Sequence, residues 1–171
     1  MADQFLHGAE VLEIDNGTRA IRTPKSSVQF FCGTAPDADN NLVPLNEPVL
    51  IDGPGTATAL GATGTLPDCF RAAYGQGYPL SVMVRVAEDA DFATQIANVV
   101  GDAAAMTGVH AALGSGSVLG VEPRIFSAPG FTGQRIDNGA NPVGAALKGL
   151  VEKARGTLIG LSSDSLRPVC A

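Results

Sequence analysis

A strand–helix–strand pattern between residues 123 and 161 is the feature that most constrains how this chain folds. Pro123–Ala128 is apolar and β-prone, and a Pro-Gly turn follows it. Pro142–Arg155 has apolar residues at helical spacing and is followed by a glycine. Thr157–Leu161 is a second short apolar segment. Two strands joined by one helix at this spacing lie parallel in one sheet, so the pattern predicts an α/β fold, a mixed α+β arrangement with a βαβ unit.

The segments before residue 123 predict further strands and helices. In residues 78–86 the even-numbered positions from Leu80 to Val86 are apolar, which indicates a strand with one apolar face. Residues 89–105 have the apolar spacing of a helix, which Gly101 interrupts. Further predicted elements are a central strand at 27–32, a short strand at 48–51, a helix at 66–74 that Thr65 can cap, a short helix or turn at 109–113 and a flexible joint at Ser115–Ser117.

The distribution of charge argues against a nucleic-acid partner. The chain has 171 residues and a net charge of −6. No lysine or arginine occurs from Ser26 to Phe70, where the charged residues are Asp37, Asp39, Glu47, Asp52 and Asp68. Phosphate contacts need clustered basic side chains, which this pattern does not supply. No apolar run is long enough for a membrane span and no signal peptide is visible, so we expect no membrane binding and assembly in a cytoplasm.

No pattern of residues points to catalysis, a cofactor or a metal. The chain has 2 histidines, His7 and His110, and neither has an Asp or Cys at ligand spacing. The glycines of residues 114–120 and 53–55 do not match a nucleotide-binding loop. We therefore expect no catalytic, cofactor-binding or metal-binding residue, and we interpret these glycines as turns and the histidines as core or surface residues.

The cysteines leave two interpretations open. Cys32, Cys69 and Cys170 are far apart and odd in number, and they lack the paired spacing of a zinc site. They are either buried or incidental thiols, or one of them links neighbouring subunits. Cys170 is the best candidate for such a link because it lies near the end of the chain.

The first residues of the chain predict an extended arm. The apolar and polar residues of Ala9, Glu10, Val11, Leu12, Glu13 and Ile14 alternate as in a strand with one buried face. Gly17 supplies a turn after this strand, and Pro24 interrupts a second short alternation. The strand is either an edge strand of its own domain or a strand donated to the sheet of another copy.

Several segments in series resemble one known family. They are His7–Val11, Asn16–Thr23, Ser26–Val28, Gly33–Asp39, Pro44–Leu50, Val84–Glu88, Ser117–Ile125 and Ala128–Gly130. In this order and spacing they are similar to segments near the start of contractile tail sheath proteins of P2-like bacteriophages and R-type pyocins. The resemblance extends over nearly the whole chain, although members of this family are much longer.

The resemblance implies a domain organisation and a function. Residues 1–24 would form the extended N-terminal arm, residues 25–120 a small α/β domain, and residues 121–171 the start of a larger α/β core domain whose second half is absent. Ala9–Ile14 would join a sheet in a neighbouring subunit, and Gly17 and Pro24 would be hinges. The protein would then be a non-enzymatic component of a virion tail. Its implied partners are other sheath subunits in a helical homo-oligomer, the tail tube protein, and baseplate and tail terminator proteins.

Two other functions remain open at this stage. The βαβ unit is also typical of small Rossmann-like ligand-binding domains and enzymes. A short sheath-like chain would also suit an adaptor or terminator at one end of a tail.

Overall fold

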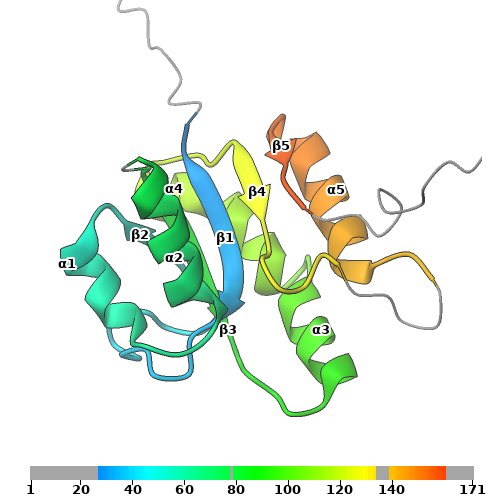
Figure 1. Cartoon of the computed structure of the whole chain (residues 1–171). Helices are drawn as coiled ribbons and strands as arrows, with labels where there is room; N and C mark the ends of the chain where they lie inside the picture. The colour runs from blue at the N-terminus through cyan, green and yellow to red at the C-terminus, as the bar shows by residue number, and fades with distance from the viewer. Residues whose placement is uncertain (1–26, 78, 134–138, 161–171) are drawn as a thin grey trace, which may run out of the picture.

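The computed structural model describes residues 27–77, 79–133 and 139–160, and their centre is a five-stranded sheet with the strand order β2-β3-β1-β4-β5 (Figure 1). Four of its strands run parallel: β1 (Gln29–Thr34), β3 (Ser81–Val86), β4 (Ile125–Ser127) and β5 (Thr157–Leu158). The fifth, β2 (Pro48–Ile51), pairs antiparallel with β3 at one edge. β1 is the central strand, as the apolar residues Phe30, Phe31 and Cys32 predict.

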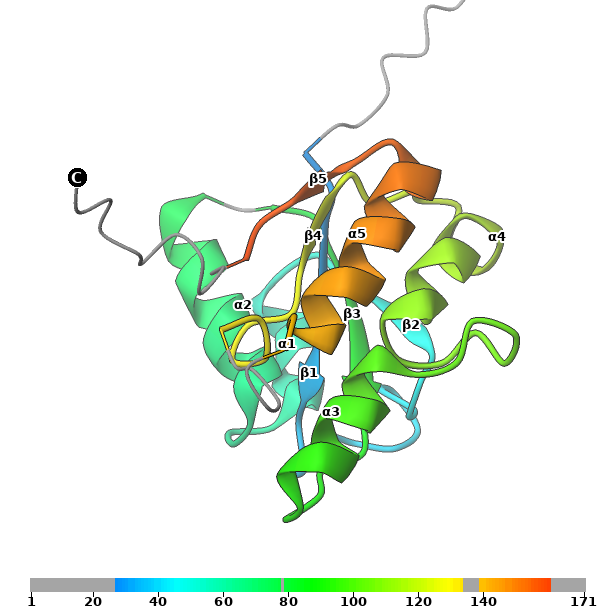
Figure 2. The same ribbon diagram turned by 90° about the vertical axis from the view of Figure 1, so that its right-hand side faces the viewer.

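Helices cover both faces of this sheet. One face carries α1 (Pro54–Ala57), the 3-10 turn η1 (Thr58–Leu60) and α2 (Thr65–Gln76). The other carries α3 (Phe92–Val100), the 3-10 segment η2 (Gly108–Gly114), α4 (Ser115–Leu119) and α5 (Pro142–Ala154). Figures 1 and 2 show α2 and α3 on opposite sides of β1. The fold is therefore α/β, as predicted.

The alternation of side chains along β3 builds two hydrophobic cores. Val82, Val84 and Val86 face the larger core, which also contains Phe30 of β1 and Leu147 of α5. Met83 faces the smaller core under α2, together with Leu66 and Phe70. This division follows from the period of two in a strand and confirms the predicted faces of residues 80–86.

The chain fills both sides of β1. From β1 it goes first to β2 at the edge and returns through α1, η1 and α2 to β3, which lies next to β1. From β3 it crosses through α3 to β4 on the other side of β1. It then crosses through α5 to β5, so the predicted βαβ unit is confirmed as β4-α5-β5 with parallel strands. The boundary expected after residue 120 falls between strands that share this one sheet.

The predicted helix at 89–105 is too long at its C-terminal end. The helix α3 ends at Val100, because Gly101 has a φ of +66°. A Cβ atom at Gly101 would lie 2.2 Å from the carbonyl oxygen of Thr107, so this close approach needs glycine. Gly101 therefore ends the helix instead of interrupting it.

Two shorter predictions are also wrong. Ser115–Ser117, expected as a flexible joint, is the start of helix α4, and the Ser115 hydroxyl donates a 2.6 Å hydrogen bond to the Ala112 carbonyl. Thr65, expected as the N-cap of the helix at 66–74, is the first residue of α2, and Gly64 is the N-cap. The Thr65 side chain instead accepts a hydrogen bond from the backbone of β1.

Candidate assembly surfaces

The predicted inter-subunit arm lies outside the described residues. Ala9, Glu10, Val11, Leu12, Glu13 and Ile14, the hinge candidates Gly17 and Pro24, and the thiol of Cys170 all belong to ranges that the structure does not describe. Their roles stay predictions, and the surfaces below come from the described residues between 27 and 160.

The two edges of the sheet differ in their capacity to accept another strand. At one edge, β2 begins with Pro48, which has no backbone N–H to donate, and α4 lies against β2. At the other edge, Thr157 donates to the Arg124 carbonyl and Ile159 donates to the Phe126 carbonyl, at 2.6 and 2.9 Å. The alternation of a strand turns the backbone groups of Leu158 outward. In the part of the chain that the structure describes, β5 has two residues and pairs on one side only, so the edge that it offers to another strand is short.

The crevice between the carboxyl ends of β1 and β4 is where open α/β sheets bind ligands. Here the Thr34 N–H donates to Thr65 Oγ1 at 2.9 Å, and the Thr65 N–H donates to Thr34 Oγ1 at 3.3 Å. The second bond occupies the Thr65 N–H at the start of α2, which is a donor of the kind that binds anions at helix N-termini. A hollow of about 320 Å³ remains beside them, and Asp68 and Cys69 line it together with Thr65, Pro129 and Gly130. The acidic Asp68 makes this hollow unsuited to a phosphate.

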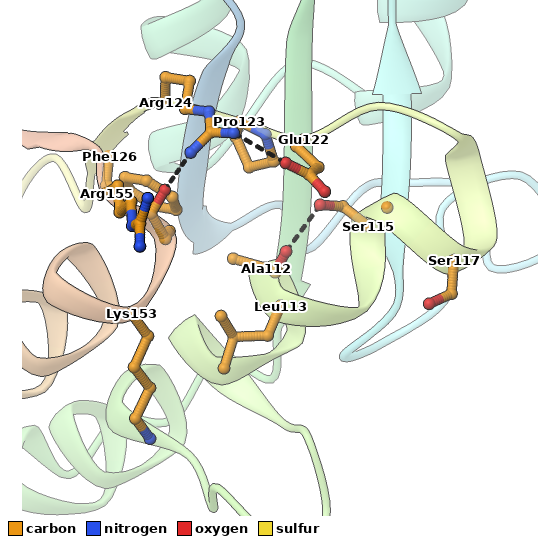
Figure 3. A pocket seen from close by; sticks show the side chains of 12 residues that line it. Ala112, Leu113, Ser115, Ser117, Glu122, Pro123, Arg124, Phe126, Lys153 and Arg155 are labelled. Atoms are coloured by element: carbon orange, nitrogen blue, oxygen red, sulfur yellow. Dashed lines mark hydrogen bonds and ion pairs between the residues drawn. The ribbon is translucent and has the colours of Figure 1, made fainter.

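A second cavity lies at the opposite, amino end of the parallel strands (Figure 3). Its volume is about 420 Å³, and its walls come from the end of η2, the start of α4, the segment before β4 and the end of α5. Arg124 donates to Glu122 at 2.9 Å and also to the Ala154 carbonyl at the end of α5. Lys153 and Arg155 also line the cavity, so it is predominantly basic. This pocket gives no signal in the sequence, because residues 112–126 and 153–155 meet only in the folded chain.

The described thiols lie in surroundings that keep them protonated. Cys32 is fully buried in β1, and burial raises the pKa of its thiol to about 12. Cys69 is partly buried on α2, and burial together with the neighbouring Asp68 raises its pKa to about 11. Neither thiol has the low pKa of a reactive cysteine.

The two histidines and the possible metal ligands complete the list of candidates for chemistry. His110 is half-buried in η2, and His7 lies outside the described ranges. Among the residues that the structure describes, no cluster of His, Cys, Asp and Glu could hold a metal ion. No helix in those ranges has the length and apolar character to cross a membrane.

Comparison with known proteins relates the chain to one class of protein. No family model matches the chain. A search of curated proteins finds 36% identity over 142 residues, 77% of this chain, to a tail sheath protein of Escherichia phage P2. The chain is related to the tail sheath proteins.

Further sheath relatives extend this similarity over more of the chain. A putative prophage major tail sheath protein of Pseudomonas aeruginosa (strain UCBPP-PA14) is 32% identical over 160 residues, which is 91% of this chain. The major tail sheath protein of Serratia phage KSP20 is 33% identical over 144 residues. The resemblance to tail sheath proteins inferred from the sequence is therefore confirmed.

The relationship to the sheath proteins covers part of their length. The matched region is 36% of the length of the phage P2 relative and 40% of the Pseudomonas relative. The chain thus spans well under half the length of these sheath proteins. That it shares the activity of a whole sheath protein is a proposal.

Proposed function

We propose that this chain is a structural subunit, or part of one, in a contractile phage-type tail sheath. The observation that carries the proposal is the similarity to tail sheath proteins over up to 91% of the chain. In this role copies polymerise around a tail tube and drive the tube out when the sheath contracts. The proposed partners are other sheath subunits, the tube, the baseplate and the tail terminator, in a virion tail assembled in a host bacterial cytoplasm. The proposed role involves no catalysis.

The architecture suits a unit that moves without changing its internal structure. A sheath that contracts must shift whole subunits while the contacts between them persist. Two hydrophobic cores, one on each face of the sheet, make such a unit rigid, because close-packed interiors resist deformation. Sequence-distant segments from Val28 to Leu150 share the larger core, so the described part of the chain holds together as one body.

Strand addition is the proposed link between copies. Backbone hydrogen bonds to an added strand supply affinity, and alternate side chains supply register. Ala9–Ile14 is the proposed donated strand, and the outward edge of β5 is a surface of the acceptor type. Gly17 and Pro24 are the proposed hinges that would let such an arm change direction, and Cys170 is a candidate thiol for a covalent link.

A Rossmann-like ligand-binding function is less well supported. The crevice that such a protein would use is occupied by the paired Thr34 and Thr65, and Asp68 lies beside it. A thermal-shift screen against nucleotides tests this alternative, because a reproducible stabilisation by one of them would favour it over the sheath.

Co-assembly with a complete sheath protein tests the proposal. We expect this chain, expressed together with the phage P2 tail sheath protein, to appear in the rings or tubular assemblies seen by electron microscopy. A variant that lacks residues 1–15 is the matched control. It should keep the melting temperature of the parent chain and lose association if those residues are a donated arm. Exclusion of the parent chain from every assembly would contradict the proposed role.

A further inference from the structure

The carboxyl end of the parallel strands carries a set of exposed acidic side chains, which we call the acidic end. Its members follow β1, precede β2 or follow β3: Asp37, Asp39, Glu47, Glu88, Asp89 and Asp91. Glu47 belongs to the same end as Glu88, because the neighbouring Asn46 N–H donates to the carbonyl of Arg85 at 2.8 Å, close to the end of β3. These carboxylates come from segments far apart in sequence, so folding gathers them.

The cations near the acidic end do not neutralise its surface. The Arg85 side chain is 5% exposed, and it donates to the carbonyls of Ala35 and Ala38 beneath the loop after β1. Arg71 pairs with Asp68 at 2.6 Å, so its charge is already matched. The pKa of Asp91 lies below its usual value because the Thr94 N–H donates to it. The acidic end is therefore a negative surface at neutral pH.

The basic pocket of Figure 3 lies at the other end of the same strands. Arg124 precedes β4, and α5 runs back along the sheet so that Lys153 and Arg155 also reach this end. Arg124 already binds Glu122 and the last carbonyl of α5. Within the described ranges, neither Lys153 nor Arg155 pairs with a carboxylate. Both are exposed, and they leave an unmatched positive charge at the mouth of a cavity of about 420 Å³.

Apolar side chains accompany the charges at both ends. Leu42 and Leu45, in the loop beside the acidic residues, are 61% and 46% exposed. Leu113 lines the basic pocket and is 38% exposed, and Val118 on the adjoining α4 is 68% exposed. A contact between the two ends would therefore combine ion pairs with burial of apolar surface, which is the usual composition of a protein interface.

We propose that the acidic end of one copy of this chain docks on the basic pocket of a second copy. The two surfaces lie at opposite ends of the strands, so one molecule cannot bring them together. A head-to-tail contact of this kind leaves a free acidic end and a free pocket in every pair, so it propagates into a ring or a filament. Arginine and lysine at the pocket would bind carboxylates of the neighbour, with arginine offering a two-point contact. This inference rests on the proposed sheath function and specifies one contact between neighbouring copies of the chain.

Charge reversal with complementation tests the contact. One variant reverses the charge of the acidic end (Glu47→Lys with Glu88→Lys). These two exposed side chains were chosen because the structure shows no hydrogen bond to either of them. The other reverses the pocket (Lys153→Glu with Arg155→Glu). Sedimentation velocity of the full chain at low and high salt measures association. We expect each variant alone to associate at least tenfold more weakly than the parent chain. An equimolar mixture should regain association, because each variant then offers the charge that the other needs.

Matched controls separate this contact from general effects of charge. Lys148→Glu is the control for the pocket, because it reverses an exposed charge on α5 outside the pocket. Asp52→Lys is the control for the acidic end, because Asp52 is exposed and follows β2, whereas Glu47 precedes it. Both should associate as the parent chain does. The neutral variant Lys153→Gln with Arg155→Gln should fall between the parent and the reversed pocket, and circular dichroism should show that every variant is folded. Salt should weaken the parent contact, because the Debye length falls from about 10 Å at 0.1 M to about 3 Å at 1 M.

The outcomes distinguish failure of this contact from failure of the proposed function. A parent chain that stays monomeric at low salt, or a mixture of the two reversed variants that does not regain association, would overturn the contact. Co-assembly with the phage P2 sheath protein would still support the sheath function in that case. Association of the parent chain with exclusion from sheath assemblies would leave the contact standing and contradict the function.

Discussion

Thr34, the last residue of β1, and Thr65, the first residue of α2, exchange two hydrogen bonds. The Thr34 N–H donates to Thr65 Oγ1 at 2.9 Å, and the Thr65 N–H donates to Thr34 Oγ1 at 3.3 Å. The pair ties the central strand to the helix that covers the smaller core. It also places a protein hydroxyl where a related fold would hold a ligand.

Replacing Thr65 with alanine should destabilise the protein. The substitution leaves the Thr34 N–H without its acceptor in a region where Thr34 is 4% exposed. An unsatisfied buried donor costs about 1–3 kcal/mol, which urea denaturation can measure. Thr63→Ala is the control, because it removes a threonine hydroxyl that donates to the Asp37 carboxylate at the exposed surface, and it should change the free energy of unfolding by less than about 0.5 kcal/mol. Equal effects of the two substitutions would contradict the role of the Thr34–Thr65 pair.

Two glycines should respond to alanine in opposite directions. A Cβ atom at Gly33 would lie 2.2 Å from Thr65 Oγ1, so Gly33→Ala forces β1 and α2 apart and should cost about 1–3 kcal/mol. Gly149 lies inside α5, and a Cβ atom there would meet no other atom within 4 Å, so Gly149→Ala should stabilise the protein by about 0.5–1 kcal/mol. Thermal unfolding of both variants checks the signs, and a neutral Gly33→Ala would show that the strand and helix can separate without cost.

Arg85 should be needed for the loop after β1. Its guanidinium donates to the carbonyls of Ala35 and Ala38 and to the Asn40 side chain, so one buried side chain connects three residues of this loop. Arg85→Met keeps much of the buried volume and removes the donors, so we expect a loss of about 2–4 kcal/mol. Hydrogen exchange should also become faster in residues 35–43.

An exposed arginine provides the comparison for Arg85. Arg71 forms a surface ion pair with Asp68, and the two side chains are 65% and 75% exposed. Arg71→Met should therefore cost less than about 1 kcal/mol and leave exchange of residues 35–43 unchanged. The interpretation of Arg85 fails if the two arginine variants unfold at the same urea concentration.

Stability should fall with rising pH through the thiol of Cys32. Burial raises the pKa of this thiol to about 12 in the folded protein, whereas an unfolded cysteine titrates at about 8.5. The folded state therefore holds its proton where the unfolded state loses it. The stabilisation is complete below about pH 8.5 and decreases above it, by at most about 1.4 kcal/mol per pH unit from this thiol.

Urea denaturation between pH 8 and pH 11 measures this dependence. Cys32→Ala should unfold more easily than the parent chain at pH 8, because it leaves a small cavity under α3. Its stability should then change less steeply with pH, because one titrating thiol is gone. A slope identical to that of the parent chain would rule out Cys32 as the source.

Local patterns in the sequence were sufficient to predict most individual elements. The alternation in residues 80–86 assigned Met83 and Val84 to opposite faces, and both cores confirm that assignment. The apolar run before Gly33 predicted a central strand, which in the structure lies between β3 and β4. These features depend on residues close in the sequence, so a short window contains them.

Features that depend on distant residues could not be predicted in this way. The end of α3 depends on Gly101 lying against Thr107 and Gly108. That contact forms only because the chain turns back on itself between residues 101 and 108. The buried position of Arg85 depends on a loop some fifty residues earlier (the contact with Ala35 spans 50 positions). The basic pocket needs the end of α5 beside the segment before β4, an arrangement that follows from the strand order.

Pro48 removes one backbone donor from β2, whereas the backbone groups of Leu158 face away from β4 at the opposite border of the sheet. A strand added beside β5 would extend the sheet by one strand spacing, about 4.8 Å, and would leave the helices on both faces in place.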